Sequence, residues 1–445
     1  YFSNMPKWIL YSVILLSLGG YYIIGYHTER SDFRQLISLY SALFLCSYII
    51  LKNKSQINLN LLIYTSLIFR FCLLFSIPAL SDDFYRFLWD GRIQQLQFNP
   101  FDYTPRQLLV QSSDTFLVEL FPKLNSPDYY SVYPQLCQSI FNLAAWIGQD
   151  SLLNNIIVLK SFILLAETGS IFLLLKLLQA YNIDQKQALI YALNPLVIVE
   201  LSGNIHFEAF MISFFLLAVW LMMNRKVYLS AAALSLAIQA KLLPLIALPL
   251  LFSKTGARKA LYYSAICLLM TVVMSLGTIN SFERISNIMQ SLNLYYGKFE
   301  FNGGLYNLFR TIGWHILGYN PIQIVTKILF LMSLTGMIWV YFKSTDLLSG
   351  FFLLLSIYLG FSAIVHPWYL CPLIALTPFV NYRFVLIWSA LIPLSYFTYS
   401  KFPYSENSYL VALEYLSVAY FLIREYSAFR SEPIQHKNPE GLRNS

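Results

Sequence analysis

The chain has 445 residues, of which 57% are hydrophobic and 12% charged, and its mean hydropathy is +0.57. Ordinary soluble domains carry about twice that fraction of charged residues, so the composition excludes a soluble enzyme and indicates a multi-spanning membrane protein. The net charge of +8 does not indicate a nucleic-acid partner, because the lysines and arginines lie in short loops between apolar runs. Such placement is typical of residues that set membrane topology, with acidic lipid as a secondary partner.

The apolar runs are about 16 to 25 residues long and lack a period of two, so we expect helices, which satisfy their own backbone hydrogen bonds in lipid. The fold class is therefore an all-α integral membrane bundle of about 13–14 membrane segments. In chain order we expect them near 7–26, 33–51, 58–80, 153–178, 186–202, 208–223, 228–239, 241–253, 260–279, 321–343, 348–365, 368–380, 383–400 and 408–427. The segments 228–239 and 241–253 are too short to cross twice, so we expect a half-depth hairpin.

Residues 1–430 are expected to form a single domain, followed by a polar, disordered cytoplasmic tail at 431–445. Most short-loop cations fall on one side, which the positive-inside tendency makes the cytoplasm, together with both termini. Arg30 and Arg34 are exceptions. Two polar segments, 81–150 and 280–320, then face outward. Their apolar pieces, 107–120 and 288–296, are predicted to be helices lying along the interface.

The richest segment runs from Ser81 to Pro105. If it begins as a helix, Asp83, Arg86 and Asp90 share one face, so a carboxylate and a cation address one cavity. Such a pair suits group transfer to a hydroxyl, although a solvated ion-pair cluster is the alternative. The same segment and the loop after it supply further polar and aromatic residues, which suit a sugar or isoprenoid surface or an interfacial belt: Asp82, Trp89, Arg92, Asn99 and Tyr133.

A second group of polar residues lies inside apolar runs. Glu167 and Glu200 must find partners in lipid, and we expect Lys241 or Arg86, although purely structural ion pairs are the alternative. His206 and Glu208 follow where one run turns into the next. Lys241 sits at the tip of the expected hairpin, where an ammonium suits a lipid-linked phosphate, or else snorkels to the interface.

Two further groups complete the outward face. Asn302 and Arg310 lie in the second polar segment, and His366-Pro367-Trp368-Tyr369 ends a later run. No glycine-rich phosphate loop, Walker motif or HExxH motif occurs, so nucleotide substrates are not indicated. We expect no cofactor. A divalent metal on the paired aspartates has no supporting spacing.

The pattern D-D-x-Y-R-x-x-W-D-G-R from Asp82 to Arg92, followed by Asn99-Pro100, resembles the polyprenol-phosphate-mannose-dependent mannosyltransferases of the C-type glycosyltransferase superfamily. The similarity continues, in order, to about residue 372. It includes Tyr133-Pro134, Asn194-Pro195 with Glu200, Gly203-Asn204-x-His206, the stretch around Lys241, Phe299-Glu300-Phe301-Asn302 and His366-Pro367-Trp368-Tyr369. The chain departs from the expected pattern at Gln135, where a second proline is usual, and at Glu208, where aspartate is usual.

The resemblance implies a helical membrane enzyme that moves a hexose, expected to be mannose, from a polyprenyl-phosphate donor to a hydroxyl of a glycan, lipid or protein. The reaction would take place on the periplasmic, extracellular or lumenal face. The family's first-loop aspartate acts as general base, which maps to Asp83, with Asp82 as second choice. We expect one displacement with inversion. A lipid-linked sugar flippase or transporter, or an oligosaccharide polymerase or ligase, are the alternatives.

The remaining candidate residues divide into two sets. Those expected at the donor phosphate are Arg86, Arg92, Lys241, Arg310 and His366. Those expected around the sugar and acceptor are Trp89, Asp90, Asn99, Tyr133, Glu167, Glu200, His206, Glu208, Asn302, Trp368 and Tyr369.

Overall fold

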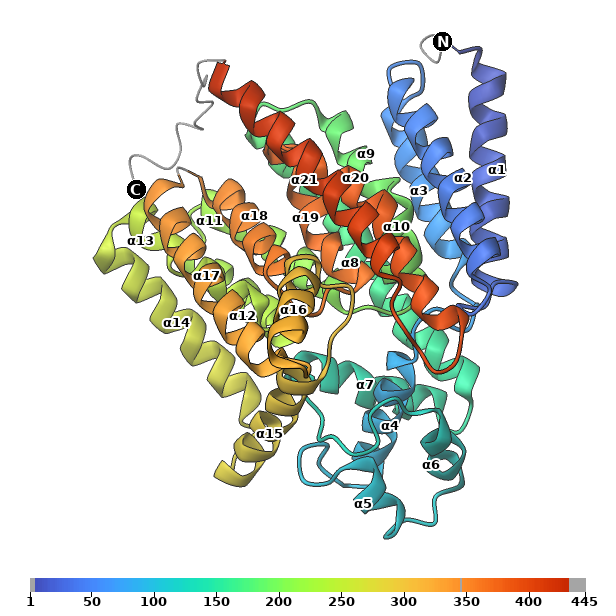
Figure 1. Ribbon diagram of the computed structural model, residues 1–445, viewed down its shortest axis with the longest axis vertical. Coiled ribbons are helices and arrows are strands. Elements are labelled where there is room, and N and C mark those ends of the chain that lie inside the picture. Colours follow the sequence, from blue (N-terminus) through green and yellow to red (C-terminus); the bar gives the residue numbers. More distant parts are fainter. Residues whose placement is uncertain (1–4, 345, 432–445) are drawn as a thin grey trace.

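The computed structural model describes residues 5–344 and 346–431, and these residues fold mainly into helices (Figure 1). The predicted tail at 431–445 lies outside the described residues except for Ser431. The first half of the chain contains α1 (Lys7–Tyr26), α2 (Phe33–Lys52), α3 (Leu59–Cys72), α4 (Asp83–Gln95), α5 (Pro105–Leu109), α6 (Thr115–Leu120), η1 (Phe121–Lys123), α7 (Gln135–Gly148), α8 (Leu152–Ala180), η2 (Gln185–Ala188), α9 (Leu189–Ala192), α10 (Pro195–Val197), η3 (Ile198–Gly203) and α11 (Glu208–Met223).

The second half is also helical apart from loops and an isolated backbone bridge between Phe301 and Ile364. It contains α12 (Val227–Ala240), η4 (Leu243–Ala247), α13 (Leu250–Thr255), α14 (Ala257–Ser275), α15 (Phe282–Lys298), α16 (Gly304–Leu317), α17 (Ile322–Lys343), α18 (Leu347–Gly360), η5 (Pro367–Leu370), α19 (Cys371–Leu376), η6 (Thr377–Phe379), α20 (Phe384–Leu391), η7 (Ile392–Ser400) and α21 (Ser408–Ser431).

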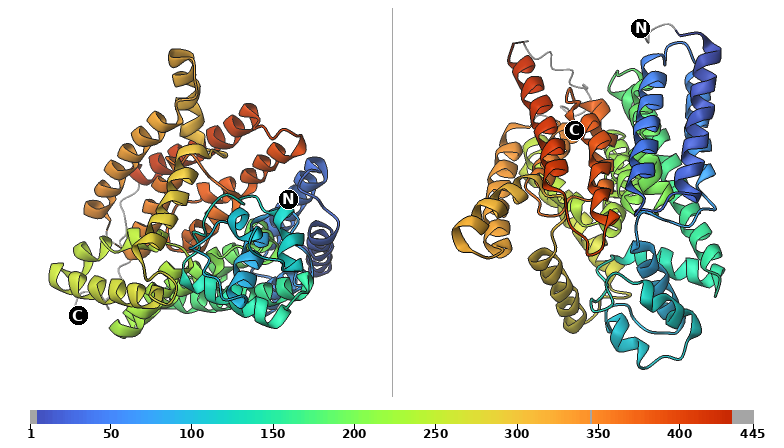
Figure 2. Two further views of the ribbon diagram at one scale, coloured as in Figure 1. Left: turned by 90° about the horizontal axis from the view of Figure 1, so that it is seen from below. Right: turned by 45° about the vertical axis from the view of Figure 1, so that its right-hand side comes forward.

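The helices form a bundle with a smaller lobe at one end. Helices α4 to α7 make the lobe and α15 lies at the same end, opposite the start of α1 and the end of α21 (Figures 1 and 2). The two polar segments of the sequence therefore meet on one side of the bundle, as their expected topology requires. The all-α membrane class is confirmed.

Fewer helices than expected are long enough to cross a membrane. Within the described residues, five pass by length and composition: α1, α2, α8, α14 and α17. A sixth span results if the bent pair of 195–203 and α11 is counted as one. Other apolar helices have 10–17 residues, including α3, α12 and α18. Prolines and polar residues interrupt the remaining runs, and hydropathy alone does not register such breaks.

Two helices are predicted within the polar segments, and local turn chemistry divides the first of them. The expected helix over 107–120 is two helices, α5 and α6, each with its own cap. Thr104 forms a capping box with Gln107, and the Asp114 carboxylate accepts a hydrogen bond from the backbone N–H of Leu117. These side chains satisfy the free N–H groups at each helix start, so two short helices replace one. The helix expected over 288–296 is confirmed as part of α15.

Helix α4 packs closely on α7 because Gly91 has no side chain. A Cβ at this position would lie 2.3 Å from the backbone oxygen of Phe141. Four residues earlier on α4, Phe87 stacks on the ring of Phe141 with centroids 4.7 Å apart. The glycine of the Asp-Gly-Arg motif thus sets the position of the helix that carries Asp83.

The chain bends by 111° between η3 and α11. The segment before the bend is a π-helix, and Ile205 after it has a positive φ of 61°, which is rare for a β-branched residue. Asn204 secures the turn, because its side-chain oxygen accepts a hydrogen bond of 3.2 Å from the backbone N–H of Leu80. The bend is thereby attached to the loop that leads into α4. Strained backbone and π-helical turns often mark functional positions.

Candidate active site

Asp83 is a half-buried carboxylate at the start of α4. Its Oδ1 accepts a hydrogen bond of 2.9 Å from the amide of Asn125. Within the described residues, Asp83 forms no ion pair. Burial raises the pKa of Asp83; the bond from Asn125 lowers it, and the charges of Glu208 and Asp82 raise it further. The site therefore contains a carboxylate with increased affinity for a proton.

The neighbouring Asp82 is in a different state, because it forms an ion pair with Arg30. The guanidinium of Arg30 lies 2.5 Å from Asp82 Oδ2 and 4.6 Å from the centre of the Tyr399 ring. We did not predict Arg30 or Tyr399 as site residues. Arg30 did carry a signal, since it is a cation on the side of the membrane where the positive-inside tendency disfavours one.

Glu208 and Lys241 form a second ion pair, and the charges of both residues act on Asp83. The side chain of Glu208 is 5% exposed and that of Lys241 is 33% exposed. The ammonium also lies 4.0 Å from the centre of the Tyr369 ring, within the range of a cation–π contact. The bend before α11 places Glu208, and the break that ends α12 places Lys241.

Four rings from three parts of the chain form a stack beside this pair. Trp368 lies between His206 and His366, with centroids 3.7 Å and 4.4 Å away, and Phe301 covers His366 at 4.7 Å. Two buried ring nitrogens, His206 Nε2 and His366 Nδ1, have no hydrogen-bond partner in the described residues. Burial and the nearby Lys241 lower the pKa of His366 to about 3, so its ring is neutral.

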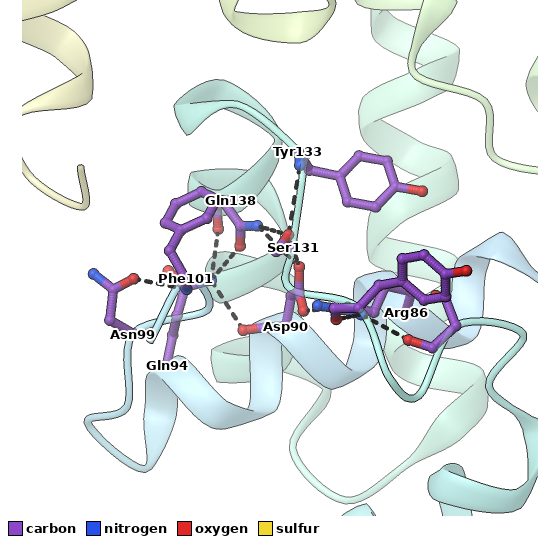
Figure 3. A network of polar contacts seen from close by, with 10 residues as sticks. Arg86, Asp90, Gln94, Asn99, Phe101, Ser131, Tyr133 and Gln138 are labelled. Carbon is purple, nitrogen blue, oxygen red and sulfur yellow. Dashed lines mark hydrogen bonds and ion pairs between the residues drawn. The ribbon is translucent and has the colours of Figure 1, made fainter. Parts of the chain in front are cut away.

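Arg86 and Asp90 belong to a buried network that closes the lobe (Figure 3). Arg86 Nε lies 2.7 Å from Asp90 Oδ1, and Arg86 also donates to the backbone oxygens of residues 126 and 129. Asp90 accepts further bonds from Ser131 at 2.5 Å and from Gln138 at 2.9 Å. The predicted shared face of α4 is thus present, but within the described residues Arg86 and Asp90 are directed toward the loop rather than toward Asp83.

Other predicted residues contact partners of their own. Arg92 pairs with Asp114 and Asp150, and Arg310 pairs with Glu300. The remaining contacts are those of Asn302 with Glu414, of Asn99 with the backbone oxygen of Thr278, of Trp89 with Phe121 and of Tyr133 with Phe87 and Phe141. Of the expected donor-phosphate cations, the structure brings Lys241 to Asp83.

The partners expected for the two intramembrane glutamates are wrong. Glu167 pairs with Arg70, 2.9 Å away, and both side chains are fully buried. Glu200 accepts hydrogen bonds of 2.8 Å from the phenols of Tyr40 and Tyr396. The bundle brings α3 and α2 against these glutamates, and no local spacing in the sequence indicates which helices pair.

Gln135 stands where the expected Tyr-Pro-Pro pattern has its second proline, and its contacts show what the replacement provides. Its backbone N–H, which a proline would lack, donates to the Oε1 of Gln239 at 2.9 Å. The amide of Gln239 in turn donates to the backbone oxygen of Thr271 at 2.7 Å. Because Gln239 lies two residues before Lys241, this contact fixes the end of α12 against the lobe.

No three His, Cys, Asp or Glu side chains converge as metal ligands would in residues 5–344 and 346–431. The absence of a cofactor stays a prediction. In comparisons with known proteins, the family model described as "alpha-(1->6)-mannopyranosyltransferase, N-terminal domain" matches residues 28–255. This match confirms the resemblance to mannosyltransferases. No curated protein matches the chain. Because the matched region covers half of the chain and contains Asp83, Glu208 and Lys241, the chain belongs to the alpha-(1->6)-mannopyranosyltransferase family.

Proposed function

We propose that this membrane protein transfers mannose from a polyprenyl-phosphate donor to an acceptor hydroxyl, with Asp83 as general base. The observation that supports this most is the state of Asp83, a half-buried carboxylate without an ion-pair partner in the described structure, which lies near Glu208, Asp82 and Lys241. Membership in a mannosyltransferase family supports the choice of sugar.

Asp83 suits the role of base better than Asp82. A general base needs a carboxylate that is open to the acceptor, and Asp82 is already occupied by its ion pair with Arg30. Asp83 forms no ion pair in the described structure, and burial raises its pKa and so increases its proton affinity. A base whose pKa is raised toward the working pH is the more effective proton acceptor.

The chemistry is one displacement at the anomeric carbon. Asp83 takes the proton of the acceptor hydroxyl while the oxygen of that hydroxyl forms the new glycosidic bond to the anomeric carbon. The bond to the donor phosphate oxygen breaks on the opposite face, and its electron pair leaves with polyprenyl phosphate, so the configuration inverts. General-base catalysis contributes about 10²–10⁴-fold to such a step. Lys241 is the cation that we assign to the leaving phosphate.

We assign the other candidates by their contacts. The rings of His206, His366 and Trp368 suit a sugar surface, and burial lowers the pKa of both histidines. The ring nitrogens that lack a hydrogen-bond partner can bond to hydroxyls or phosphate oxygens, although His206 Nε2 also lies 3.8 Å from Glu200 Oε2. Arg86, although first expected at the donor phosphate, is assigned to holding the lobe, because its donors are used within it. The same reasoning excludes Arg92 and Arg310 from the reaction centre.

We infer that the site faces away from the cytoplasm and that both termini lie in the cytoplasm. Lys54, Lys186 and Arg383 are close together, since the charges of Arg383 and Lys186 contribute to lowering the pKa of Lys54 after the larger effect of burial. The lobe lies at the end of the bundle opposite the start of α1 (Figure 1). A basic cluster at one end and the site at the other fit the positive-inside tendency.

The test is transfer by the purified protein. We expect radiolabelled polyprenyl-phosphate-mannose to yield labelled acceptor and free polyprenyl phosphate, and Asp83→Asn to reduce the rate by at least about 100-fold. Asp128→Asn is the matched control, because Asp128 is an exposed carboxylate of the same lobe. Near-normal turnover by Asp83→Asn would refute the base assignment. Donor that crosses a vesicle membrane without releasing polyprenyl phosphate would indicate a transporter.

A further inference from the structure

Lys241, the cation that we assign to the donor phosphate, already forms an ion pair with the carboxylate of Glu208. The two groups are in direct contact, and within the described residues Glu208 is the one acid that contacts the ammonium. The lysine side chain is 33% exposed, whereas the glutamate is 5% exposed. The open side of the ammonium therefore gives an incoming anion access to this ion pair.

A carboxylate and a phosphate compete for the same ammonium because both are anionic oxygen ligands. Lys241 has no alternative anionic partner among its contacts in the described structure, so a phosphate must share or replace Glu208. Sharing places two anions on one ammonium in a partly dehydrated site, which is unfavourable unless one moves away. Glu208 stands at the first position of α11, after the strained turn at Ile205.

We propose that Glu208 is a displaceable occupant of the donor-phosphate position, released from Lys241 when the phosphate of the donor binds. This inference rests on the proposed function, because it concerns the phosphate of that same donor. Glu208 is then a positioning residue that sets donor affinity and the order of binding, rather than a residue that reacts with the sugar.

Release of Glu208 has a consequence for Asp83. The charge of Glu208 already acts on Asp83 in the direction of higher proton affinity, and Lys241 acts in the opposite direction. When the donor phosphate takes over Lys241, the opposing effect of the ammonium is neutralised while the carboxylate stays near. Asp83 therefore becomes a stronger base when the donor is bound, which favours binding of the donor before the acceptor.

The experiment measures binding, so it does not depend on turnover. Full-length protein in detergent is titrated with polyprenyl monophosphate, and with unphosphorylated polyprenol as a control. We expect Glu208→Gln to bind the phosphate about tenfold more tightly than the unchanged chain, Glu208→Asp to bind with similar affinity, and Lys241→Gln to bind more weakly. Polyprenol affinity should be the same for all four proteins. Equal or weaker phosphate binding by Glu208→Gln would overturn the proposal.

A second measurement covers the case in which Glu208→Gln does not fold. Lys241 of the unchanged protein is labelled with an amine-reactive reagent, with and without polyprenyl monophosphate, and quantified by mass spectrometry. Protection by the phosphate but not by polyprenol supports the proposal, and unchanged labelling overturns it. If Glu208→Gln binds more tightly but no mannose is transferred, the displacement stands and the proposed function fails. Transfer without tighter binding gives the reverse conclusion.

Discussion

The assignment of Arg86 to the lobe, rather than to the donor, can be tested by Arg86→Met. The side chains of Arg86 and Asp90 are 4% and 0% exposed, and their ion pair is 2.7 Å long. Methionine keeps most of the apolar volume but leaves Asp90 buried with the neutral donors of Ser131 and Gln138. Removing one partner of a buried pair costs about 3–5 kcal/mol. We expect this loss in local stability of the lobe.

Hydrogen exchange followed by mass spectrometry measures that loss directly. Amides of α4 and of residues 121–134 should lose protection, whereas those of α8 should keep theirs, because local opening is confined to the affected unit. The double variant Arg86→Met/Asp90→Leu should recover part of the loss, since no unpaired charge remains. Arg106→Met is the control, because Arg106 forms an exposed ion pair in the same lobe. Full protection in Arg86→Met, together with a raised KM for the donor, would refute the reasoning.

Three further predictions concern individual side chains. Since burial raises the pKa of Asp83, kcat/KM should fall as the pH decreases through a value above the ordinary aspartate pKa of 3.8. A pH profile of kcat/KM whose acid limb lies at that ordinary value would contradict the base assignment. Arg30→Gln should move this acid limb to still higher pH, because Asp82 loses its cation, and an unmoved limb would show that the pair does not act on Asp83. Asp114→Ala should destabilise the lobe by about 1 kcal/mol through loss of the helix cap. Burial raises the pKa of Asp114, but the hydrogen bond from Arg92 and other contacts lower it overall, so the stabilisation that Asp114 provides is present at neutral pH and lost as pH falls through that lowered pKa. Thermal unfolding of both proteins at pH 7 and pH 3 measures this stabilisation and its loss. An equal difference between Asp114→Ala and the unchanged chain at the two pH values would contradict the assignment.

Local patterns predicted well what depends on neighbours in sequence. The spacing of Asp83, Arg86 and Asp90 gives a shared face if the segment is helical, and the structure has that helix. The short length of the runs around Lys241 predicted a break there, and α12 ends at residue 240. Both features follow from side chains within a few residues of each other, which a sequence displays directly.

Contacts between segments far apart in the sequence could not be predicted from local patterns. The sequence did not indicate that Arg70 pairs with Glu167, or that Arg30 pairs with Asp82, because helix packing determines both contacts. Fewer described helices than expected are long enough to cross a membrane, for a related reason. Hydropathy counts apolar residues, but it does not register that Asn194 and Pro195 begin a new helix within an apolar run.

The stack combines His206, which lies inside the matched family region, with Phe301, His366 and Trp368, which lie beyond its end at residue 255. The region that carries Asp83 thus lacks three of the four rings. Chimeras made by joining this region to the second half of a relative would bring together two surfaces that did not evolve against each other. Such exchanges should therefore transfer both halves of the stack, and inhibitors that bind it would have to be optimised against the whole chain.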